Sequence, residues 1–210
     1  MDQKRWDERY SRAEFEWSMH PSQFVTAELD GLTPGRALDL AAGEGRNSVW
    51  LAEHGWAVTA VDFSRVGLAK GRNLAAARGV PDGRVEWVVA DLADYIPARD
   101  TFDLVLIAYL QVGAGLRARV LSASAAALAP GGTLLLVGHD LANLTEGTGG
   151  PRYPEVLYTP EAVTAELGGL RILRAERVRR TVPRPDGPAP AIDTLVRAER
   201  PAGDPDQPGA

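Results

Sequence analysis

The feature that most constrains this chain is a regular alternation of short apolar runs with helical segments between residues 35 and 138. The apolar runs that predict strands lie at residues 35–40, 56–62, 84–90, 102–107 and 133–137. Strands that are mostly apolar are covered on both faces, and alternation with helices joins them by right-handed crossovers into a parallel sheet. The pattern therefore predicts a doubly wound α/β domain. Such a sheet binds ligands beyond the carboxyl ends of its strands, where the strand order reverses.

The region after residue 138 predicts the end of this sheet. Two further runs, at residues 171–182 and 191–198, have the length and composition of strands. Residues 183–188 between them are rich in proline and predict a hairpin-like turn, which makes the last strand antiparallel. The expected fold class is α/β: a doubly wound, mostly parallel, seven-stranded Rossmann-like sheet with an antiparallel last strand and helices on both faces.

Three stretches differ in composition and set the expected organisation of the chain. Residues 1–33 look helical and are rich in aromatic side chains. Residues 34–200 are expected to form one domain, because a chain of 210 residues holds one sizeable core and two independent domains would be cramped. Residues 201–210 form a short polar tail that we expect to be disordered.

Composition excludes several classes of protein. The chain has no cysteine, which rules out disulfide scaffolds, thiolate zinc sites and cysteine nucleophiles, and we expect no metal site. No apolar run approaches the roughly 20 residues of a membrane span. The N-terminus is mixed in charge and lacks the apolar stretch of a signal peptide. We therefore expect a cytoplasmic enzyme or binding protein with no membrane contact.

The net charge of −5 argues against non-specific binding to a phosphate backbone. The charge is uneven, because residues 171–200 contain eight arginines and four acidic residues. Two interpretations fit this surplus. It is either the solvated face of a strand or a means of attracting an anionic substrate near Arg179 and Arg180.

The stretch most informative about function, residues 39–47, lies between the first predicted strand and its helix. Gly43 and Gly45 allow a tight turn and close approach of a ligand to the backbone, and the helix start offers free N–H groups. A strand-to-helix turn needs glycine in any case, so this pair alone indicates little. Two acids strengthen the indication of a ligand site, because Asp39 ends the first strand and Asp62 ends the second.

These two acids discriminate among cofactors. Asp62 is placed to accept hydrogen bonds from ribose hydroxyls, which suits any adenosine cofactor bound at the switch point. Asp39 beside the glycine turn repels a pyrophosphate and attracts an ammonium group. In addition, Ser48 stands at the third position of the dinucleotide fingerprint, where glycine or alanine is usual. S-adenosylmethionine has the ammonium group and the ribose but no phosphate, so it fits best.

A third acid follows the third predicted strand. Asp91 is placed to accept a hydrogen bond from an adenine amino group, with the backbone of Leu92 against the ring. Capping of the following turn explains Asp91 equally well. Acids after three consecutive strands nevertheless favour one ligand site over three unrelated turns.

On these residues, the sequence resembles the class I S-adenosylmethionine-dependent methyltransferases over about residues 1–200. The matching residues are Asp39-x-Ala41-x-Gly43-x-Gly45, Asp62, Asp91-Leu92 and the turn Pro130-Gly131-Gly132. Within the class, the chain looks most like the small-molecule branch that includes tellurite-resistance and thiopurine-type methyltransferases. The segments that carry this likeness are Trp6-Asp7-Glu8-Arg9-Tyr10 and Gly43-Glu44-Gly45-Arg46-Asn47-Ser48.

The resemblance implies that residues 1–33 fold over the cofactor, with Trp6 and Tyr10 lining the site. Packing of these aromatic side chains on the sheet explains each of them equally well. The family usually has glycine in place of Ala41, so we expect a weaker or slightly displaced cofactor rather than none. Cofactor contacts are expected at Trp6, Tyr10, Asp39, Ala41, Gly43, Gly45, Asp62, Phe63, Asp91, Leu92 and Ala108.

Methyl transfer from a sulfonium needs mainly in-line placement of donor and nucleophile. A thiol or a chalcogen oxyanion needs no strong base, whereas an oxygen or nitrogen nucleophile would use His139, just past the fifth strand and next to Asp140. A structural hydrogen bond explains His139 equally well. The resemblance aligns Arg179 and Arg180 with basic residues implicated in substrate contact, although Arg179 stands where histidine is familiar. Tyr109 and His139 are the candidate catalytic residues, and substrate contacts are expected at Tyr109, Gln111, His139, Arg179 and Arg180.

After the fourth strand, Ala108-Tyr109-Leu110-Gln111 is not the Asn/Asp-Pro-Pro-Tyr/Phe motif of enzymes that methylate exocyclic base amines. We therefore expect a small-molecule acceptor and no nucleic acid. Two alternatives stay open: an NAD(P)-binding Rossmann oxidoreductase, and a non-catalytic protein that binds S-adenosylmethionine. The sequence identifies neither the acceptor nor the oligomeric state.

Overall fold

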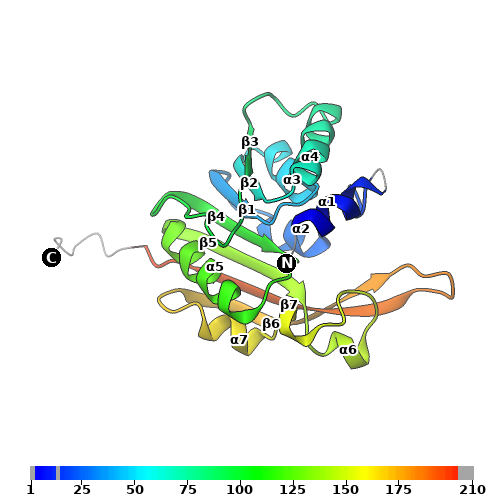
Figure 1. Cartoon of the computed structure of the whole chain (residues 1–210). Coiled ribbons are helices and arrows are strands. Elements are labelled where there is room, and N and C mark those ends of the chain that lie inside the picture. Colours follow the sequence, from blue (N-terminus) through cyan, green and yellow to red (C-terminus); the bar gives the residue numbers. More distant parts are fainter. Residues whose placement is uncertain (1–2, 13–14, 203–210) are drawn as a thin grey trace.

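The computed structural model describes residues 3–12 and 15–202 of the chain. Seven strands of these residues form one sheet in the order β3-β2-β1-β4-β5-β7-β6 (Figure 1). The strands are β1 (Arg36–Leu40), β2 (Ala57–Asp62), β3 (Val85–Val89), β4 (Phe102–Ala108), β5 (Leu128–His139), β6 (Arg171–Val182) and β7 (Ala189–Glu199). The helices are α1 (Gln3–Ser11), α2 (Gln23–Leu29), α3 (Arg46–Glu53), α4 (Arg65–Ala77), α5 (Ala114–Ala127), α6 (Asn143–Glu146), α7 (Pro160–Ala165) and the 3-10 turn η1 (Pro154–Val156).

The predicted topology is confirmed. Strands β3, β2, β1, β4 and β5 pair in parallel, and β7 lies antiparallel between β5 and β6. The chain leaves β1 towards β2 on one side, whereas β4 lies on the other side. The order of strands thus reverses between β1 and β4, which is the place where open α/β sheets bind ligands.

Side chains alternate between two cores, one on each face of the sheet. Leu104 and Leu106 of β4 pack with residues of α2 and α3, whereas Val105 and Ile107 pack with residues of α5 and α7. This alternation follows from the period of two in a strand, and it explains why β4 is apolar nearly throughout. Helices therefore cover both faces, as the sequence predicted (Figure 1).

Local capping sets where two of the helices begin. The hydroxyl of Ser64 accepts a hydrogen bond from the amide of Gly67 (3.0 Å), which starts α4 directly after β2. Thr159 accepts likewise from Ala162 (3.1 Å), with Pro160 at the first position of α7.

Two details differ from the sequence prediction. Residues 130–132, expected as a turn before a strand at 133–137, lie within β5, whose pairing with β4 is irregular at this point. Gly131 nevertheless has a φ of +80°, so a turn-like conformation is built into the strand. The connection after β5 contains α6 and η1, short helices beyond the alternation predicted for residues 35–138. Most of the tail expected to be disordered, residues 203–210, lies outside the described residues.

Across the described ranges, no helix has the length and apolar character needed to cross a membrane.

Candidate functional site

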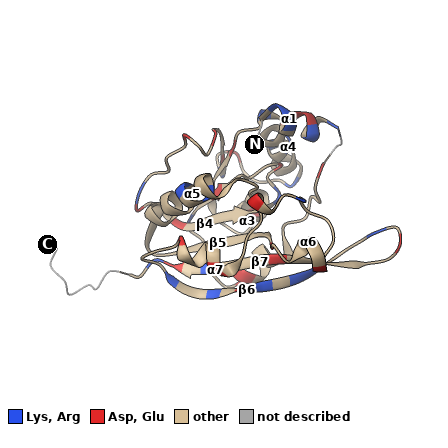
Figure 2. Ribbon diagram, turned by 60° about the horizontal axis from the view of Figure 1, so that its bottom comes forward, with Lys and Arg blue, Asp and Glu red and all other residues tan. Residues whose placement is uncertain are grey.

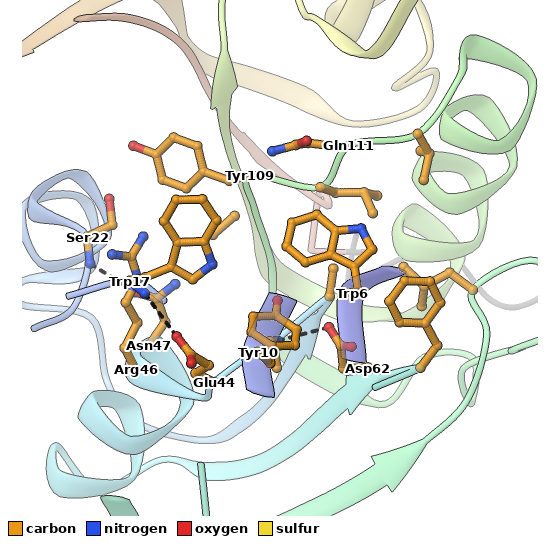
Figure 3. A pocket seen from close by; sticks show the side chains of 18 of the residues that line it. Trp6, Tyr10, Trp17, Ser22, Glu44, Arg46, Asn47, Asp62, Tyr109 and Gln111 are labelled. Atoms are coloured by element: carbon orange, nitrogen blue, oxygen red, sulfur yellow. Dashed lines mark hydrogen bonds between the residues drawn. The ribbon is translucent and has the colours of Figure 1, made fainter. Parts of the chain in front are cut away.

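A cavity of about 450 Å³ opens at the carboxyl ends of β1, β2, β3, β4 and β5, in the size range of small-molecule sites. Of the residues singled out in the sequence, those that line it are Trp6, Tyr10, Ala41, Gly43, Asp62, Phe63, Asp91, Leu92, Ala108, Tyr109, Gln111, His139 and Arg180. Asp39, Gly45 and Arg179 do not line it. Figure 3 shows aromatic side chains facing one another across the opening.

The cavity has two chemically different ends. We call the part formed by Asp62, Phe63, Asp91 and Leu92 the aspartate end. We call the part formed by Arg46, Tyr109, His139 and Arg180 the arginine end. In Figure 3, Trp6 and Tyr10 lie towards Asp62, whereas Trp17 and Arg46 lie towards Tyr109.

Asp62 is fixed in place by backbone amides. Its Oδ2 accepts from the amide of Gly43 (2.9 Å) and its Oδ1 from the amide of Ser64 (2.8 Å). Burial raises the pKa of this carboxyl, against the two amide hydrogen bonds, which lower it. Each oxygen keeps a further lone pair, and the side chain lines the cavity, so Asp62 can accept two more hydrogen bonds from a ligand.

Asp39 lies behind the cavity wall. It is buried, and its Oδ2 accepts a hydrogen bond from the hydroxyl of Ser48 (2.6 Å). Burial raises the pKa of Asp39 to about 7, while the Ser48 hydroxyl lowers it. Ser48, which stands at the third position of the dinucleotide fingerprint, is therefore the hydrogen-bond partner of Asp39. Any effect of Asp39 on a ligand acts through space, across the turn of residues 41–43.

Asp91 caps a turn and also lines the cavity. Its Oδ1 accepts from the amide of Ala93 (2.8 Å), so it caps the turn after β3. The same residue is exposed and lines the cavity next to Leu92. The structure thus leaves the capping role and the ligand-binding role compatible with each other.

The two glycines of the turn have different reasons to be glycine. Gly43 has a φ of +57° and lines the cavity, and a Cβ there would lie 2.9 Å from the hydroxyl of Tyr10. Gly45 has a φ of +74°, and a Cβ there would clash with Trp87 at 2.6 Å. Gly45 therefore serves the packing of α3 rather than the cavity. Ala41 also has a left-handed φ, +60°, which costs a non-glycine residue about 1 kcal/mol.

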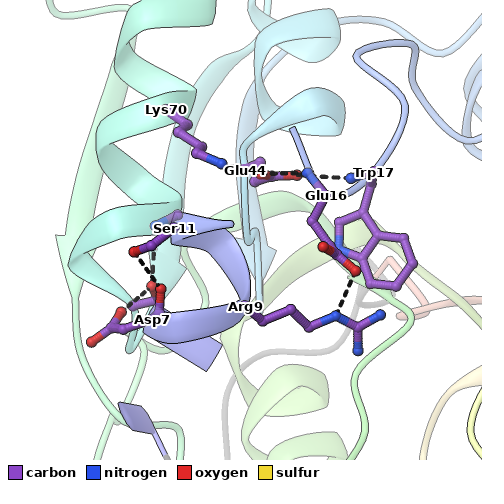
Figure 4. A network of polar contacts seen from close by, with 9 residues as sticks. Asp7, Arg9, Ser11, Glu16, Trp17, Glu44 and Lys70 are labelled. Atoms are coloured by element: carbon purple, nitrogen blue, oxygen red, sulfur yellow. Dashed lines mark hydrogen bonds and ion pairs between the residues drawn. The ribbon is translucent and has the colours of Figure 1, made fainter. Parts of the chain in front are cut away.

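Glu44, which the sequence showed only as part of a family motif and without a role of its own, anchors the N-terminal segment. Its buried carboxylate accepts from the amides of Glu16 (2.9 Å) and Trp17 (3.0 Å), and Lys70 forms an ion pair with it (3.0 Å) (Figure 4). Arg9 pairs with Glu16 (2.6 Å). No sequence pattern predicts the contact of Glu44 with this segment, because the donors are backbone amides, which every residue type except proline has.

Contacts between a guanidinium and two aromatic rings also hold the N-terminal segment in place. The guanidinium of Arg9 lies 5.1 Å from the ring centroid of Trp6 and 4.7 Å from that of Trp17. Both tryptophans line the cavity. The amide of Ser22 donates to Asn47 (3.0 Å), so the start of α2 is tied to α3 as well. The segment before β1 therefore forms one wall of the cavity.

At the arginine end, Asp193 of β7 gathers three side chains, and it too was not singled out in the sequence. Its Oδ2 accepts from the hydroxyl of Tyr109 (3.0 Å) and from Nε of Arg180 (2.7 Å). Its Oδ1 lies 3.2 Å from Nδ1 of His139. Burial, together with the charge of Asp193, raises the pKa of Tyr109 to about 12, so its hydroxyl stays protonated and serves as a donor.

Arg46, at the start of α3, stands apart from the other arginines of this end. It lines the cavity with its guanidinium 5.9 Å from the Tyr109 ring, and burial lowers its pKa. Within residues 3–12 and 15–202, no carboxylate lies in ion-pair contact with it. A largely buried cation without a carboxylate partner favours an anionic ligand group nearby.

The arginine-rich region is neutralised by acids from elsewhere in the fold. All eight arginines of residues 171–200 have a carboxylate within ion-pair distance, some of them supplied by Glu28, Asp100, Asp140 and Glu146. Several line the outer strand β6 (Figure 2). The solvated strand face accounts for most of the surplus.

The expectation that Arg179 contacts the substrate is not supported by its position. Its side chain is 68% exposed and faces Glu146 (3.9 Å), outside the cavity. Arg180 lines the cavity, because successive residues of a strand point to opposite faces. Only one of the two adjacent arginines can therefore serve this site.

Comparison with known proteins decides the family of the central domain. Residues 37–132 match the family model described as "Methyltransferase domain". The chain carries a methyltransferase domain. The match to this domain and the order of the strands agree with the class I, S-adenosylmethionine-dependent methyltransferase fold that the sequence indicated.

Two curated relatives match part of the methyltransferase domain. A demethylmenaquinone methyltransferase of Clavibacter sepedonicus is 46% identical over 74 residues, which are 35% of this chain and 29% of the relative. A ribosomal RNA small subunit methyltransferase C of Alcanivorax borkumensis is 32% identical over 116 residues, which are 50% of this chain and 32% of the relative. The chain thus spans about a third of the length of the curated relatives that it matches.

Solved structures share the fold over nearly the whole chain. N-methyltransferase NodS from Bradyrhizobium japonicum WM9, in complex with S-adenosyl-L-homocysteine, has a TM-score of 0.71 at 19% identity and covers 96% of this chain and 100% of its own. TehB from Haemophilus influenzae has a TM-score of 0.72 at 13% identity, with coverage of 93% and 67%. A protein studied for the conversion of a disulfide bond into a thioacetal group during echinomycin biosynthesis has a TM-score of 0.73 at 21% identity, with coverage of 97% and 94%.

Proposed function

We propose that this chain binds S-adenosylmethionine in the cavity and transfers its methyl group to a small molecule, in the cytoplasm. The observation that carries the proposal is Asp62, a carboxylate held by two backbone amides at the switch point, in the wall of the cavity. We also propose that residues 1–33 cover the cofactor and that residues 34–200 form the catalytic domain.

The residues present fit this cofactor. Asp62 would hold the ribose hydroxyls, Asp91 and Leu92 the adenine, and the turn at Ala41 and Gly43 the methionine part. Asp39, buried behind that turn, favours the ammonium group through its charge. When bound, S-adenosylmethionine supplies an activated methyl carbon on its sulfonium. Trp6 and Trp17 would exclude water from the reacting groups.

The glycine turn is unsuited to a dinucleotide, which speaks against an oxidoreductase. A diphosphate needs free backbone amides at this turn. Here the amide of Ala42 donates to Val61 (3.0 Å), that of Gly43 to Asp62 (2.9 Å) and that of Gly45 to Ala42 (2.9 Å). With its amides engaged and two carboxyl groups beside it, the turn favours a cation over a phosphate.

A small-molecule acceptor is supported by the shape and chemistry of the arginine end. Trp17, Ser22 and Tyr109 close around it, and Arg46 and Arg180 line it (Figure 3). Gln111 adds one amide to the wall. A cavity of about 450 Å³ with these polar groups in its wall suits a compact acceptor. We propose substrate contacts at Tyr109, Gln111, His139 and Arg180.

Calorimetry with S-adenosylhomocysteine and with NAD⁺ tests the cofactor. We expect binding of the first and none of the second, and the reverse result would overturn the proposal. A screen of thiols, phenols, amines and selenium or tellurium oxyanions for production of S-adenosylhomocysteine tests the reaction. Cofactor binding without turnover of any acceptor would favour a non-catalytic binding protein.

A further inference from the structure

Two buried polar atoms at the arginine end have no hydrogen-bond partner among the described residues. They are Nδ1 of His139 and Oδ1 of Asp193, which lie 3.2 Å apart in ion-pair contact. The other oxygen of Asp193 is engaged by Tyr109 and Arg180. A small rotation of the imidazole ring would align an N–H on Nδ1 with Oδ1. The arrangement thus pairs one histidine with one enclosed carboxylate.

We propose that Asp193 is a positioning residue that holds His139 as a general base, and that the methyl acceptor therefore presents a protonated oxygen or nitrogen. This inference rests on the proposed function and names the class of acceptor. It also separates the two explanations of His139 that the sequence left open.

The proton on His139 follows from the chemistry of its partner. Asp193 is fully buried and forms an ion pair with the guanidinium of Arg180 (2.7 Å), and its carboxylate oxygens accept hydrogen bonds. The hydrogen of a neutral His139 is then on Nδ1, which leaves the lone pair on Nε2. No described residue hydrogen-bonds Nε2, and His139 lines the cavity. The basic nitrogen is therefore available to a ligand.

The imidazole ring is also held on its faces and edges. The ring of Tyr109 lies 4.9 Å from it, centroid to centroid. On the loop after α6, Gly150 approaches so closely that a Cβ there would lie 3.0 Å from the ring. Among the charged and titratable groups of this end, Asp193 on β7 and Tyr109 after β4 contact His139. Arg180 on β6 contacts Asp193 and the Tyr109 ring, and Arg46 on α3 contacts the Tyr109 ring.

The neighbouring acid in sequence, Asp140, does not share this role. Its carboxylate is buried but is engaged by Thr194 (2.6 Å), Arg177 (3.1 Å) and the amide of Ala142 (2.8 Å). It forms no contact with the imidazole ring that the structure records. Asp140 therefore provides a matched control, because it is a second buried carboxylate beside the same histidine.

Atoms and electrons balance in the proposed step. The proton of the acceptor O–H or N–H passes to Nε2 of His139. The electron pair left on the acceptor forms the new bond to the methyl carbon, while the carbon–sulfur bond of the sulfonium breaks and leaves a neutral thioether. Asp193 stabilises the imidazolium that results, and the proton then leaves to water.

The spectroscopic test follows the tautomer of His139 by ¹⁵N NMR in the S-adenosylhomocysteine complex. The chain has three histidines, and His139→Gln assigns the signal. We expect the Nδ1–H tautomer in the wild type and the Nε2–H tautomer in Asp193→Asn, because the new amide donates to Nδ1. Asp140→Asn should leave the tautomer unchanged. A wild type with Nε2–H, or no change in Asp193→Asn, would overturn the proposal.

The kinetic test uses 4-hydroxybenzoate and 4-mercaptobenzoate as a matched pair of probes. Asp193→Asn should lower kcat for the phenol by about 100-fold or more and for the thiol, largely ionised at pH 8, by only a few-fold. An equal loss for both probes would contradict the proposal. If neither probe is methylated, the NMR measurement of the His139 tautomer decides whether the proposal holds. If S-adenosylhomocysteine does not bind, the proposed function fails, while the tautomer of the free protein still tests the pairing.

Discussion

The hydrogen bonds of Asp62 and Asp91 at the aspartate end of the cavity join residues close in sequence, whereas those of Asp193 at the arginine end join distant strands. Asp62 binds the amides of Ser64, two residues away, and Gly43, 19 residues away. Tyr109 and Asp193, by contrast, are 84 residues apart. One end is thus a local strand-to-helix motif, and the other exists only after β4, β5, β6 and β7 have assembled.

The difference in contacts matches a difference in chemistry. Asp62 at the aspartate end and Asp39 behind it are buried carboxyl groups with raised pKa values, which suits a ligand that has a cationic group and hydroxyl groups. The arginine end holds two guanidiniums and one enclosed carboxylate, which suits a ligand with an acidic group. A molecule spanning the cavity would therefore meet opposite charges at its two ends.

The largest expected effect is the dependence of folding stability on pH that Asp39 causes, and it tests the buried acids on the aspartate side of the comparison. The pKa of Asp39 is about 7 in the folded chain against an ordinary value of 3.8, so between these values the unfolded chain is ionised while the folded chain keeps a proton. Stability should thus fall as pH rises from about 4 to 7, by up to about 4 kcal/mol. Urea unfolding of the wild type and Asp39→Asn at pH 4.5 and 7.5 measures this difference.

Ser48→Ala is the control for this prediction. It removes a hydrogen bond that lowers the pKa of Asp39 in the folded chain, so the fall in stability should extend to higher pH. Cofactor binding should also release a proton near pH 6, which calorimetry in two buffers detects. The same pH dependence in wild type and Asp39→Asn would show that Asp39 is not the group responsible.

Next in size, Asp62→Ala should weaken S-adenosylhomocysteine binding by about 100-fold or more. Two charge-assisted hydrogen bonds, each worth about 1.5–3 kcal/mol, are lost, and the amide of Gly43 loses its acceptor. Calorimetry gives the affinity. Asp62→Asn keeps an oxygen for Gly43 and should lose less. Unchanged affinity in both variants would remove Asp62 from the ribose.

A third prediction tests the division between the ends at Arg46. Arg46→Gln should weaken binding of 4-hydroxybenzoate to the S-adenosylhomocysteine complex by about tenfold, since an unpaired cation is lost, and affect neutral phenol little. Arg179→Gln, which alters an exposed side chain outside the cavity, is the control. A tenfold loss of S-adenosylhomocysteine affinity instead would place Arg46 at the other end.

The smallest effect concerns Ala41. Ala41→Gly should relieve the strain of φ +60° and raise the free energy of unfolding by up to about 1 kcal/mol, partly offset by the greater freedom of glycine in the unfolded chain. Thermal unfolding measures the stability, and calorimetry shows whether the methyl group crowds the cofactor. The matched substitution Ala42→Gly, next to it, should be destabilising. A less stable Ala41→Gly would contradict the strain assignment.

Much of the fold was predictable from local patterns. The bounds of β6 agree with the predicted strand at 171–182, because alternation and flanking turns are local signals. The irregular start of β5 was missed, since pairing across a bulge depends on the register of the neighbouring strand.

The candidate site divides in the same way. Glycine conformation and the acids after strands β1, β2 and β3 follow from strand-to-helix turns, so the sequence by itself determined the fold class and the chemistry of the aspartate end. Glu44 as the anchor of the N-terminal segment and Asp193 as the partner of His139 were decided only by the tertiary structure. A buried carboxylate takes its role from whichever donors folding brings to it, and those donors lie on segments that no local pattern connects.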